Sequence, residues 1–419
     1  MKVFKFGGAS VKDAAAVRNV ADIVRLYAGE KIVVVVSAMG KTTNALEKLT
    51  RAHYYKEGNV EEQFKEIKDF HYNMVAHLFP GLNHPVYKEI ETSFIEIDWA
   101  FEEENTKGYD YLYDQVVSQG ELIATKIVAA CLEEAEMPVK WLDARDFIKT
   151  DNNYREAKID WNQTVKFSKE TIEKCFEHAD IALTQGFIGS TTENHTTTLG
   201  REGSDYSAAI LAYSLDAIEV IIWKDVPGVL NADPKQFADT KKLDTISYQD
   251  AIELAYFGAS VIHPKTIQPL QNKGIPLYVK SFINPNEEGT LIASDVVYES
   301  IIPSYIVKNN QVLISIAAKD FSFIVEENLS SIFNLFSNHK VKINLMQNSA
   351  ISFSICIDNS DKLNGLIKEL KNEFNVLYNE NVQLYTIRHY NQETLDKLIE
   401  GMTLLLEQKS RHTVQLVVK

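Results

Sequence analysis

The sequence contains very little cysteine and no stretch typical of a secreted protein. Its 419 residues include only Cys131, Cys175 and Cys356, which lie far apart and without the spacing of metal ligands. So few cysteines exclude a disulfide framework or a cysteine-rich zinc site. The opening residues 1–8 read as a strand entering a glycine turn and not as a signal peptide. We therefore expect buried thiols and a cytoplasmic location.

The chain also lacks an excess of positive charge and long apolar runs. It carries 43 Lys and Arg against 58 Asp and Glu, a formal net charge of -15. That balance disfavours a broad electrostatic surface for nucleic acid or anionic membrane. Apolar runs such as Ile32 to Val36 are far shorter than the roughly 20 residues of a membrane-spanning helix. We expect no nucleic acid and no membrane as partner, so an anionic substrate must meet positive charge locally.

The first two thirds of the chain carry the signature of an α/β domain. Strands that are apolar on both faces alternate with amphipathic helices, which predicts a three-layer α/β/α fold around a mostly parallel sheet. Helical patterns dominate from Thr43 to Glu134, which indicates a helical excursion from the sheet. The expected strands are Val3 to Phe6, Lys31 to Ser37, Pro138 to Leu142, Ile181 to Phe187, Ala217 to Trp223 and Pro276 to Lys280, and the expected helices include Asp13 to Leu26 and Ser204 to Ser214.

The character of the chain changes after a turn-rich stretch at 284–289, so we place a domain boundary near residue 298. The first domain is then 1–298 and the second 299–419. The second begins with a β-α-β-β-α-β order, which is ferredoxin-like. After Arg388 only a helix, Glu393 to Glu407, and a strand, Thr413 to Val418, remain, about half of a second such unit. The elements of this ferredoxin-like unit are expected at 312–317, 329–336, 343–346, 351–357, 363–374 and 382–387.

Two small-residue turns follow the first two strands. In the first, Lys5 stands at a strand end before Gly7 and Gly8, whose missing Cβ atoms let backbone N–H groups approach a phosphate. The segment matches neither the P-loop nor the dinucleotide fingerprint, so a plain turn is the alternative. The second turn, 37–43, lies where α/β sheets bind ligands, and its hydroxyls suit a carboxylate or phosphate. A helix cap at Thr42 or Thr43 explains it equally well.

The richest polar stretch, 196–206, places Arg201 between glycines just before a helix that begins near Ser204. A helix N-terminus favours anions, and arginine binds carboxylates through two hydrogen bonds. Capping of the helix by Ser204 or Asp205 is the alternative reading. We favour an anion-binding function because a glycine turn, an arginine and a helix start converge here.

Two further features suit a nucleotide and an amino acid. The segment 223–235 follows a strand and alternates apolar residues with Lys and Asp, as beside a nucleotide, although surface loops also have this composition. Glu121 has the charge to pair with a substrate ammonium group, although a helical glutamate is more often solvated.

Taken together and in this order, these segments resemble the aspartate kinase family within the amino-acid kinase superfamily. The resemblance covers roughly residues 1 to 293. It rests on Lys5 to Gly8, Asp143 to Phe147, Thr196 to Tyr206, Trp223 to Gly228 and Phe257 to Pro264. It implies the carbamate kinase-like fold of that superfamily.

The resemblance also implies an activity and its residues. The chain would use ATP and Mg²⁺ to convert L-aspartate to 4-phospho-L-aspartate, the first step of lysine, threonine and methionine biosynthesis. The implied catalytic residues are Lys5 and Asp205. The implied substrate-binding residues are Ser37, Thr43, Glu121, Arg201, Ser204 and Asp205, and the implied ATP-binding residues are Lys5, Gly7, Gly8, Ser10, Lys224, Asp225, Leu230, Lys235 and Ser260. No protein side chain is assigned to a metal.

Three residues depart from the family pattern. Ser260 stands where a lysine often reaches the ATP phosphates, Leu230 stands where a tyrosine often meets the adenine, and Glu202 replaces a glycine of the arginine loop. A kinase of another amino acid and a non-catalytic sensor on the same scaffold are therefore the alternative functions.

The carboxy-terminal region resembles the paired ACT domains through which family members sense lysine or threonine. Its second ACT-like part is shortened, and Asn344 stands in one strand where the family has an acidic residue. Without a carboxylate there, the ammonium group of an amino acid such as lysine loses its natural partner. Gln347, Asn348 and Ser349 are the candidates to hold a polar effector, and contact with a dimer partner is the alternative. Because the ACT-like region runs to the last residue, we expect a monofunctional enzyme that forms a homodimer or higher homo-oligomer.

Overall fold

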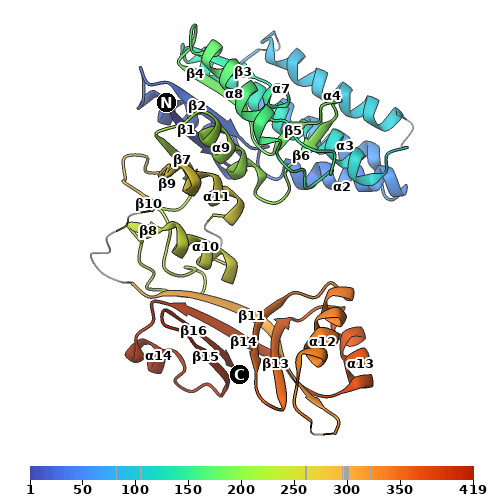
Figure 1. Cartoon of the computed structure of the whole chain (residues 1–419). Coiled ribbons are helices and arrows are strands. Elements are labelled where there is room, and N and C mark those ends of the chain that lie inside the picture. Colours follow the sequence, from blue (N-terminus) through green and yellow to red (C-terminus); the bar gives the residue numbers. More distant parts are fainter. Residues whose placement is uncertain (82, 104–105, 260–261, 295, 297–301, 321) are drawn as a thin grey trace. The chain divides into compact units, whose positions relative to one another are not determined.

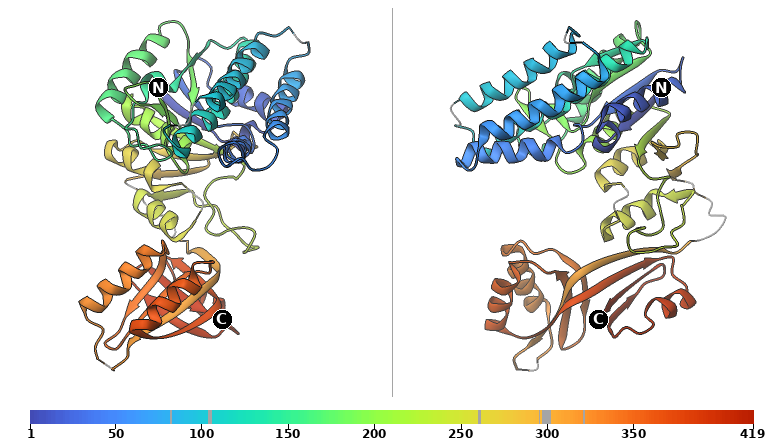
Figure 2. Two further views of the ribbon diagram at one scale, coloured as in Figure 1. Left: turned by 90° about the vertical axis from the view of Figure 1, so that its right-hand side faces the viewer. Right: turned by 180° about the vertical axis from the view of Figure 1, so that it is seen from behind.

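The computed structural model describes residues 1–81, 83–103, 106–259, 262–294, 296, 302–320 and 322–419 (Figures 1 and 2). They form two compact units. The first comprises Met1–Val229, Lys242–Ile252 and Val261–Val297, and the second comprises Leu230–Lys241, Glu253–Ser260 and Tyr298–Lys419.

The first unit is built on an eight-stranded sheet of order β3-β4-β2-β1-β7-β9-β10-β8. All neighbours pair in parallel except β9 and β10. The strands are β1 (Lys2–Phe6), β2 (Ile32–Val36), β3 (Val139–Leu142), β4 (Ile181–Gln185), β7 (Glu219–Lys224), β8 (Thr245–Ser247), β9 (Leu277–Ser281) and β10 (Thr290–Ala293), with β5 (Ile188–Ser190) and β6 (Thr196–Thr198) forming a separate hairpin.

Helices cover both faces of this sheet, as the views from opposite sides show (Figures 1 and 2). On one face α8, α9 and α11 pack together, and on the other α6 packs on β2, β3 and β4 beside α1. This confirms the predicted three-layer α/β/α fold. The helices are η1 (Gly8–Val11), α1 (Ala14–Arg25), α2 (Thr42–Tyr55), α3 (Val60–Leu78), α4 (Val86–Glu102), α5 (Tyr109–Val117), α6 (Gln119–Glu134), α7 (Ala144–Phe147), α8 (Trp161–Cys175), α9 (Gly203–Ser214), α10 (Tyr248–Phe257) and α11 (Pro264–Lys273).

Local sequence explains the elements that lead to the cavity described below. Strand β2 is β-branched and buried at every position, as expected of a central strand in a parallel sheet. Helix α1 begins where the Asp13 carboxylate accepts a hydrogen bond from the N–H of Ala16 at 2.8 Å. The register aligns Phe6 with Val36 and Trp223, so β1, β2 and β7 end side by side.

The second unit contains a six-stranded antiparallel sheet of order β12-β13-β11-β14-β16-β15. Helices α12 and α13 pack with β11, β13 and β14 around one apolar core, and α14 packs with β14 and β16 around another. The predicted β-α-β-β-α-β order is confirmed. The elements are β11 (Ser304–Ala318), α12 (Glu326–Asn338), β12 (Ile343–Asn348), β13 (Ser352–Asp358), α13 (Leu363–Glu373), β14 (Phe374–Arg388), α14 (Gln392–Leu398), β15 (Leu404–Lys409) and β16 (Thr413–Val418).

The shortened second half differs from expectation. The helix predicted from Glu393 to Glu407 is wrong in its second part, because α14 ends at Leu398 and Leu404–Lys409 is strand β15. Gly401, with φ +79, adopts the left-handed conformation after the helix, and β15 then pairs with β16. Strand pairing here overrides the helix propensity of the leucines.

Two segments that the predicted boundary assigned to the first domain pack with the second unit, namely Leu230–Lys241 and Glu253–Ser260. Two hydrogen bonds join the first segment to residues 303–305. The N–H of Tyr305 donates to the carbonyl of Asn231 at 2.7 Å, and the Asn231 side chain donates to the carbonyl of Pro303 at 2.9 Å. Such contacts join residues far apart in sequence, so a composition change at one position cannot reveal them.

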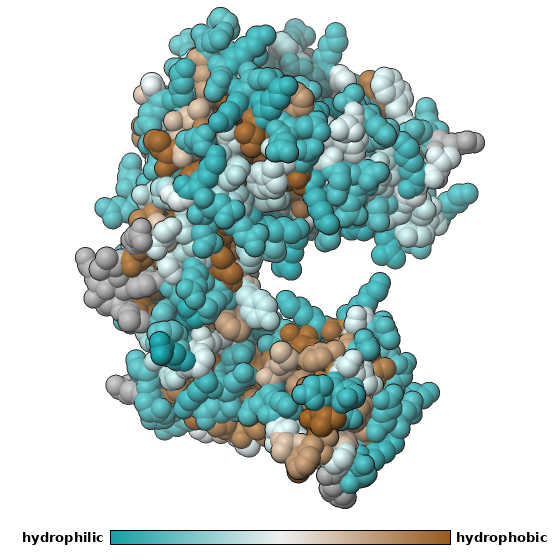
Figure 3. All heavy atoms as spheres, in the orientation of Figure 1, coloured by the Kyte–Doolittle hydropathy of each residue, from teal (hydrophilic) through white to brown (hydrophobic). Residues whose placement is uncertain are grey.

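Apolar side chains gather on the face of the second unit seen in Figure 3. The large apolar residues exposed on this unit include Phe323, Phe333, Met346, Ile351 and Leu377. A surface of this kind is typical of an interaction site. Among the described residues, no helix has both the length and the apolar character needed to cross a membrane.

Candidate active site

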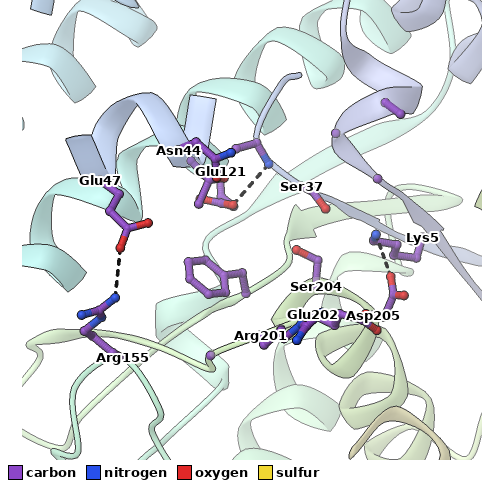
Figure 4. Close-up of a pocket in the computed structure, with 18 of the residues that line it drawn as sticks. Lys5, Ser37, Asn44, Glu47, Glu121, Arg155, Arg201, Glu202, Ser204 and Asp205 are labelled. Carbon is purple, nitrogen blue, oxygen red and sulfur yellow. Dashed lines mark hydrogen bonds and ion pairs between the residues drawn. The ribbon is translucent and has the colours of Figure 1, made fainter. Parts of the chain in front are cut away.

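A cavity of about 1020 Å³ lies at the carboxyl ends of β1, β2 and β7 in the first unit (Figure 4). Ligands of open α/β sheets bind at this edge. Loops after these strands line the cavity together with helices α2, α5, α6 and α9. Twelve of the predicted site residues line it: Lys5, Gly7, Gly8, Ser10, Ser37, Thr43, Glu121, Arg201, Ser204, Asp205, Lys224 and Asp225.

The glycine turn after β1 is packed directly against the turn after β2. A Cβ atom on Gly8 would lie 2.8 Å from the carbonyl oxygens of both Ala38 and Gly40. No side chain fits this space, so the position requires glycine. The close packing brings the two turns together as one wall of the cavity.

Lys5 and Asp205 form a buried ion pair at one end of the cavity (Figure 4), and the partly exposed Lys224 completes a charge cluster with them. The Lys5 Nζ lies 2.6 Å from Asp205 Oδ1, and their side chains are only 11% and 7% exposed. Lys224 Nζ lies 4.0 Å from the other oxygen of Asp205. Burial alone would raise the pKa of Asp205, but the charges of Lys5 and Lys224 outweigh it and hold the pKa below its ordinary value. The cluster therefore presents two cations, one of them fixed by a carboxylate.

Glu121 projects from α6 into the same cavity and is 2% exposed. One carboxylate oxygen accepts a hydrogen bond from the N–H of Ala38 at 3.3 Å, whereas Oε2 has no partner among the described residues. Burial raises the pKa of Glu121 to about 8. A buried acceptor without a donor is costly, so this oxygen suits a cationic ligand group.

The arginine loop adopts left-handed backbone conformations at Gly200, with φ +76, and at Glu202, with φ +54. Glycine adopts this backbone conformation at a lower cost than glutamate does. The Arg201 side chain is exposed and forms no hydrogen bond or ion pair within the part of the chain that the structure describes. Its guanidinium is available for an anion.

The structure does not support the capping alternatives. Helix α9 begins at Gly203 without a side-chain cap, and Ser204 and Asp205 lie in its first turn, facing the cavity. Helix α2 begins at Thr42, also without a side-chain cap. The Thr42 hydroxyl lies 3.3 Å from the ring Nε2 of buried His71, and Thr43 lines the cavity.

Sequence reasoning missed Glu47 and Arg155, which line the other end of the cavity, and the buried Asp114 beside them. Arg155, in the loop between β-bridge residues Thr150 and Ile159, has φ +69. Its guanidinium lies 3.0 Å from Glu47 on α2 and 4.3 Å above the ring of Tyr113. Nothing in the local pattern around these residues signals a site, because they meet only in the folded chain.

Asp114 forms hydrogen bonds with two segments that lead to the cavity, the loop of Arg155 and strand β6. It is fully buried, and its oxygens accept hydrogen bonds from the N–H of Arg155 at 3.0 Å and from the N–H and hydroxyl of Thr198 at 2.9 and 2.6 Å. Burial raises the pKa of Asp114 to about 7, although these hydrogen bonds favour the carboxylate. Asp114 thus joins α5 to the loop of Arg155 and to the strand that leads to Arg201.

Replacing Asp114 tests this role. We expect Asp114→Ala to lower the free energy of unfolding by about 3 kcal/mol, because buried donors lose their acceptors. Asp114→Asn is the matched control and should cost less than about 1 kcal/mol. Its carbonyl can accept both N–H groups while its amide donates to the Thr198 hydroxyl. Urea unfolding of both variants at pH 8 measures the difference, and equal losses would contradict this assignment.

The remaining predicted site residues do not line this cavity. Leu230 and Lys235 belong to the second unit, so their role at the nucleotide remains a prediction. Ser260 lies outside the described residues. Gln347, Asn348 and Ser349 are exposed at the end of edge strand β12, so their role toward an effector remains a prediction.

Comparisons with known proteins agree with this geometry. Residues 1–281 match the amino acid kinase family. Lysine-sensitive aspartokinase 3 of Escherichia coli (strain K12) is 32% identical over 361 residues, which cover 85% of this chain and 78% of that protein. Crystal structures of E. coli aspartokinase III with aspartate and ADP and with lysine and aspartate have TM-scores of 0.79 and 0.84 at 28% identity. Each alignment covers 100% of this chain and 96% of the other.

The chain therefore belongs to the amino acid kinase family, whose fold it shares. It is an ATP-dependent kinase. Within the family it groups with the aspartokinases, as the identity over most of its length shows.

Proposed function

We propose that the cavity binds L-aspartate and ATP side by side and transfers the γ-phosphoryl group to the β-carboxylate of L-aspartate. The observation that carries this proposal is the position of the unpartnered Glu121 oxygen opposite the available Arg201 guanidinium, beside the Lys5 cluster (Figure 4). An amino acid presents an ammonium group and a carboxylate to these two side chains. The E. coli enzyme that was crystallised with aspartate and ADP supports both ligands.

The proposed arrangement places the two reacting groups at the Lys5 end. Arg201 holds the α-carboxylate and Glu121 holds the ammonium group, with Ser37, Thr43 and Ser204 completing the polar wall. The β-carboxylate then extends toward Lys5. Gly7, Gly8 and Ser10 line the phosphate path, and Lys224 and Asp225 border the nucleotide.

The chemistry then requires little beyond positioning and charge neutralisation. The β-carboxylate of aspartate is ionised at neutral pH, so its oxygen attacks the γ-phosphorus without a general base. A P–O bond to the nucleotide breaks, and ADP leaves with the electron pair. Lys5 stabilises the charge that spreads over the transferred phosphoryl oxygens, and Asp205 fixes Lys5 in place.

The donor set fits Mg²⁺ bound mainly through the nucleotide. The described residues contain no cluster of three or more His, Cys, Asp or Glu that would enclose a metal by itself. Asp205 and Asp225 are the carboxylates at the phosphate end of the cavity. Mg²⁺ commonly uses one or two carboxylates together with phosphates and water. When bound, it neutralises charge on the ATP phosphates.

We further propose that the second unit is the regulatory and dimer-forming part of the enzyme. Its exposed apolar residues support self-association. Gln347, Asn348 and Ser349 are candidates for an amino-acid effector, since the E. coli relative has been crystallised with lysine. The three cysteines are buried and unpaired, which supports a reducing, cytoplasmic location.

Trapping the product tests the proposed function. The purified chain is incubated with ATP, Mg²⁺, hydroxylamine and L-aspartate, and in parallel with L-glutamate. We expect aspartyl hydroxamate from L-aspartate, because hydroxylamine captures acyl phosphates, and little product from the longer L-glutamate. Absence of hydroxamate with L-aspartate would contradict the proposal, and equal rates for both acids would assign the activity to another amino-acid kinase.

A further inference from the structure

An ion pair spans the cavity beside the residues proposed to hold the amino acid. Glu47 on α2 lies 3.0 Å from Arg155 on the opposite wall, and both side chains line the cavity (Figure 4). Their side chains are 43% and 38% exposed, so the pair lies toward the mouth. A partly exposed pair contributes little to stability and separates easily.

At two places in the cavity, a carboxylate on one wall is matched by a guanidinium on the facing wall. Glu121 and Glu47 come from helices α6 and α2 on one wall, whereas Arg201 and Arg155 come from loops on the facing wall (Figure 4). An amino acid has the same polarity, with an ammonium group and a carboxylate on one carbon. The pair Glu47–Arg155 therefore repeats the polarity of Glu121 and Arg201 nearer the mouth.

The backbone at Arg155 is held in an unfavourable conformation. Its φ of +69 lies in the left-handed region, which costs a non-glycine residue on the order of 1 kcal/mol. The buried Asp114 carboxylate fixes the Arg155 N–H, and the ring of Tyr113 supports the guanidinium from below at 4.3 Å. Asp110, 3.5 Å away, adds a second carboxylate beside the guanidinium. The fold thus maintains an arginine where glycine would be less strained, and its guanidinium is directed at the cavity.

We propose that Arg155 and Glu47 determine specificity for a free amino-acid head group. The inference rests on the proposed function. When L-aspartate binds, its α-carboxylate displaces Glu47 from Arg155 and contacts Arg155 as well as Arg201. Its ammonium group contacts Glu47 as well as Glu121 while it is held for reaction. Acids that lack the ammonium group interact with Arg155 alone.

Steady-state kinetics of two variants test the proposal on the full-length enzyme. We expect Arg155→Gly and Glu47→Gln each to raise KM for L-aspartate about tenfold, as for a partly exposed charge-assisted contact. The kcat and the KM for ATP should change less than about threefold, because neither residue reaches the phosphoryl group. Glycine accommodates the backbone at 155, and Glu47→Gln leaves that loop unchanged, so at least one variant folds normally.

Succinate, which lacks the ammonium group, separates recognition from a merely structural role. Its inhibition constant against L-aspartate should rise in Arg155→Gly, fall back toward wild type in Arg155→Lys, and not rise in Glu47→Gln, which frees Arg155 from its ion pair. Arg51→Ala is the matched control, because Arg51 is an exposed residue of α2 that does not line the cavity. A change of less than twofold in KM for L-aspartate, or equal effects of both variants on succinate, would overturn the inference. An inactive wild type would instead overturn the proposed function, and calorimetric titration of L-aspartate into the same proteins still compares their affinities.

Discussion

Replacing Lys5 with alanine is expected to lower kcat by about 10³-fold, the largest catalytic effect we expect from one substitution. Lys5 is the cation at the end of β1, 2.6 Å from Asp205, beside the glycine turn that borders the phosphates. Without it, charge on the transferred phosphoryl group loses its nearest protein partner. Removal also leaves the buried Asp205 carboxylate with Lys224 at 4.0 Å as its remaining cation in the cluster, so the pKa of Asp205 should rise.

Hydroxamate formation at saturating ATP and L-aspartate measures this effect. Lys140→Ala is the matched control, because Lys140 is an exposed lysine on β3 of the same sheet and should leave kcat unchanged. The double variant Lys5→Met with Asp205→Asn removes both charges and should recover stability without recovering activity. A Lys5→Ala enzyme that keeps more than a tenth of wild-type kcat would contradict the catalytic role of Lys5.

Replacing Glu121 with glutamine is expected to raise KM for L-aspartate by about 100-fold, because a buried charge partner of the ammonium group is lost. The same substitution should stabilise the unliganded protein above neutral pH. Glu121 is buried, and one of its oxygens has no partner among the described residues. Its carboxylate form is therefore unfavourable until a cation binds.

The sign of the pH dependence follows from the raised pKa of Glu121. The folded protein binds this proton up to about pH 8, whereas the ordinary value is 4.5. Between these two values the folded state holds more protons than the unfolded state, so the stability contribution present at low pH is lost as pH rises. The gap in thermal midpoint between Glu121→Gln and wild type should widen from pH 5 to pH 8 and stay constant above pH 8.

Differential scanning calorimetry across pH 5 to 9 measures that gap. Binding of L-aspartate to wild type near pH 7 should also release protons, because the ammonium group favours the carboxylate form of Glu121. Calorimetric titrations in buffers of different ionisation enthalpy detect this release. A constant gap, together with no proton release, would show that Glu121 is already ionised in the empty cavity.

Much of the fold follows from local patterns. The β-branched run of β2 and the period of α1 are encoded in consecutive residues, and the predicted elements of the first unit lie within a few positions of β1, β2, β3, β4, β7, β9, α1 and α9. The short strands β5, β6, β8 and β10 were not predicted. In the second unit, β11 and β14 begin eight residues earlier than predicted, and at Leu404–Lys409 leucine favours helix but pairing with β16 makes a strand. That pairing depends on a partner strand, which local propensity does not include.

The candidate site likewise combines residues that local motifs indicate with residues that only the folded chain brings together. Lys5, Gly8 and Arg201 stand in short segments whose residue types already suggest phosphate and carboxylate binding, and the structure brings them to one cavity. Glu47 and Arg155 are 108 positions apart, and neither has a local motif. Their ion pair depends on the helical excursion packing beside the loop at 151–158.

The sequence by itself determined the fold class, the strand-end turns and the charges available at them, because these depend on residue type and short-range periodicity. Only the tertiary structure decided which charges meet. It buried the Lys5–Asp205 pair, left one Glu121 oxygen without a partner, placed Asp114 behind two loops and joined Leu230–Lys241 to the second unit. Burial and long-range contacts set the pKa values and the cavity, since they arise only when distant segments pack together.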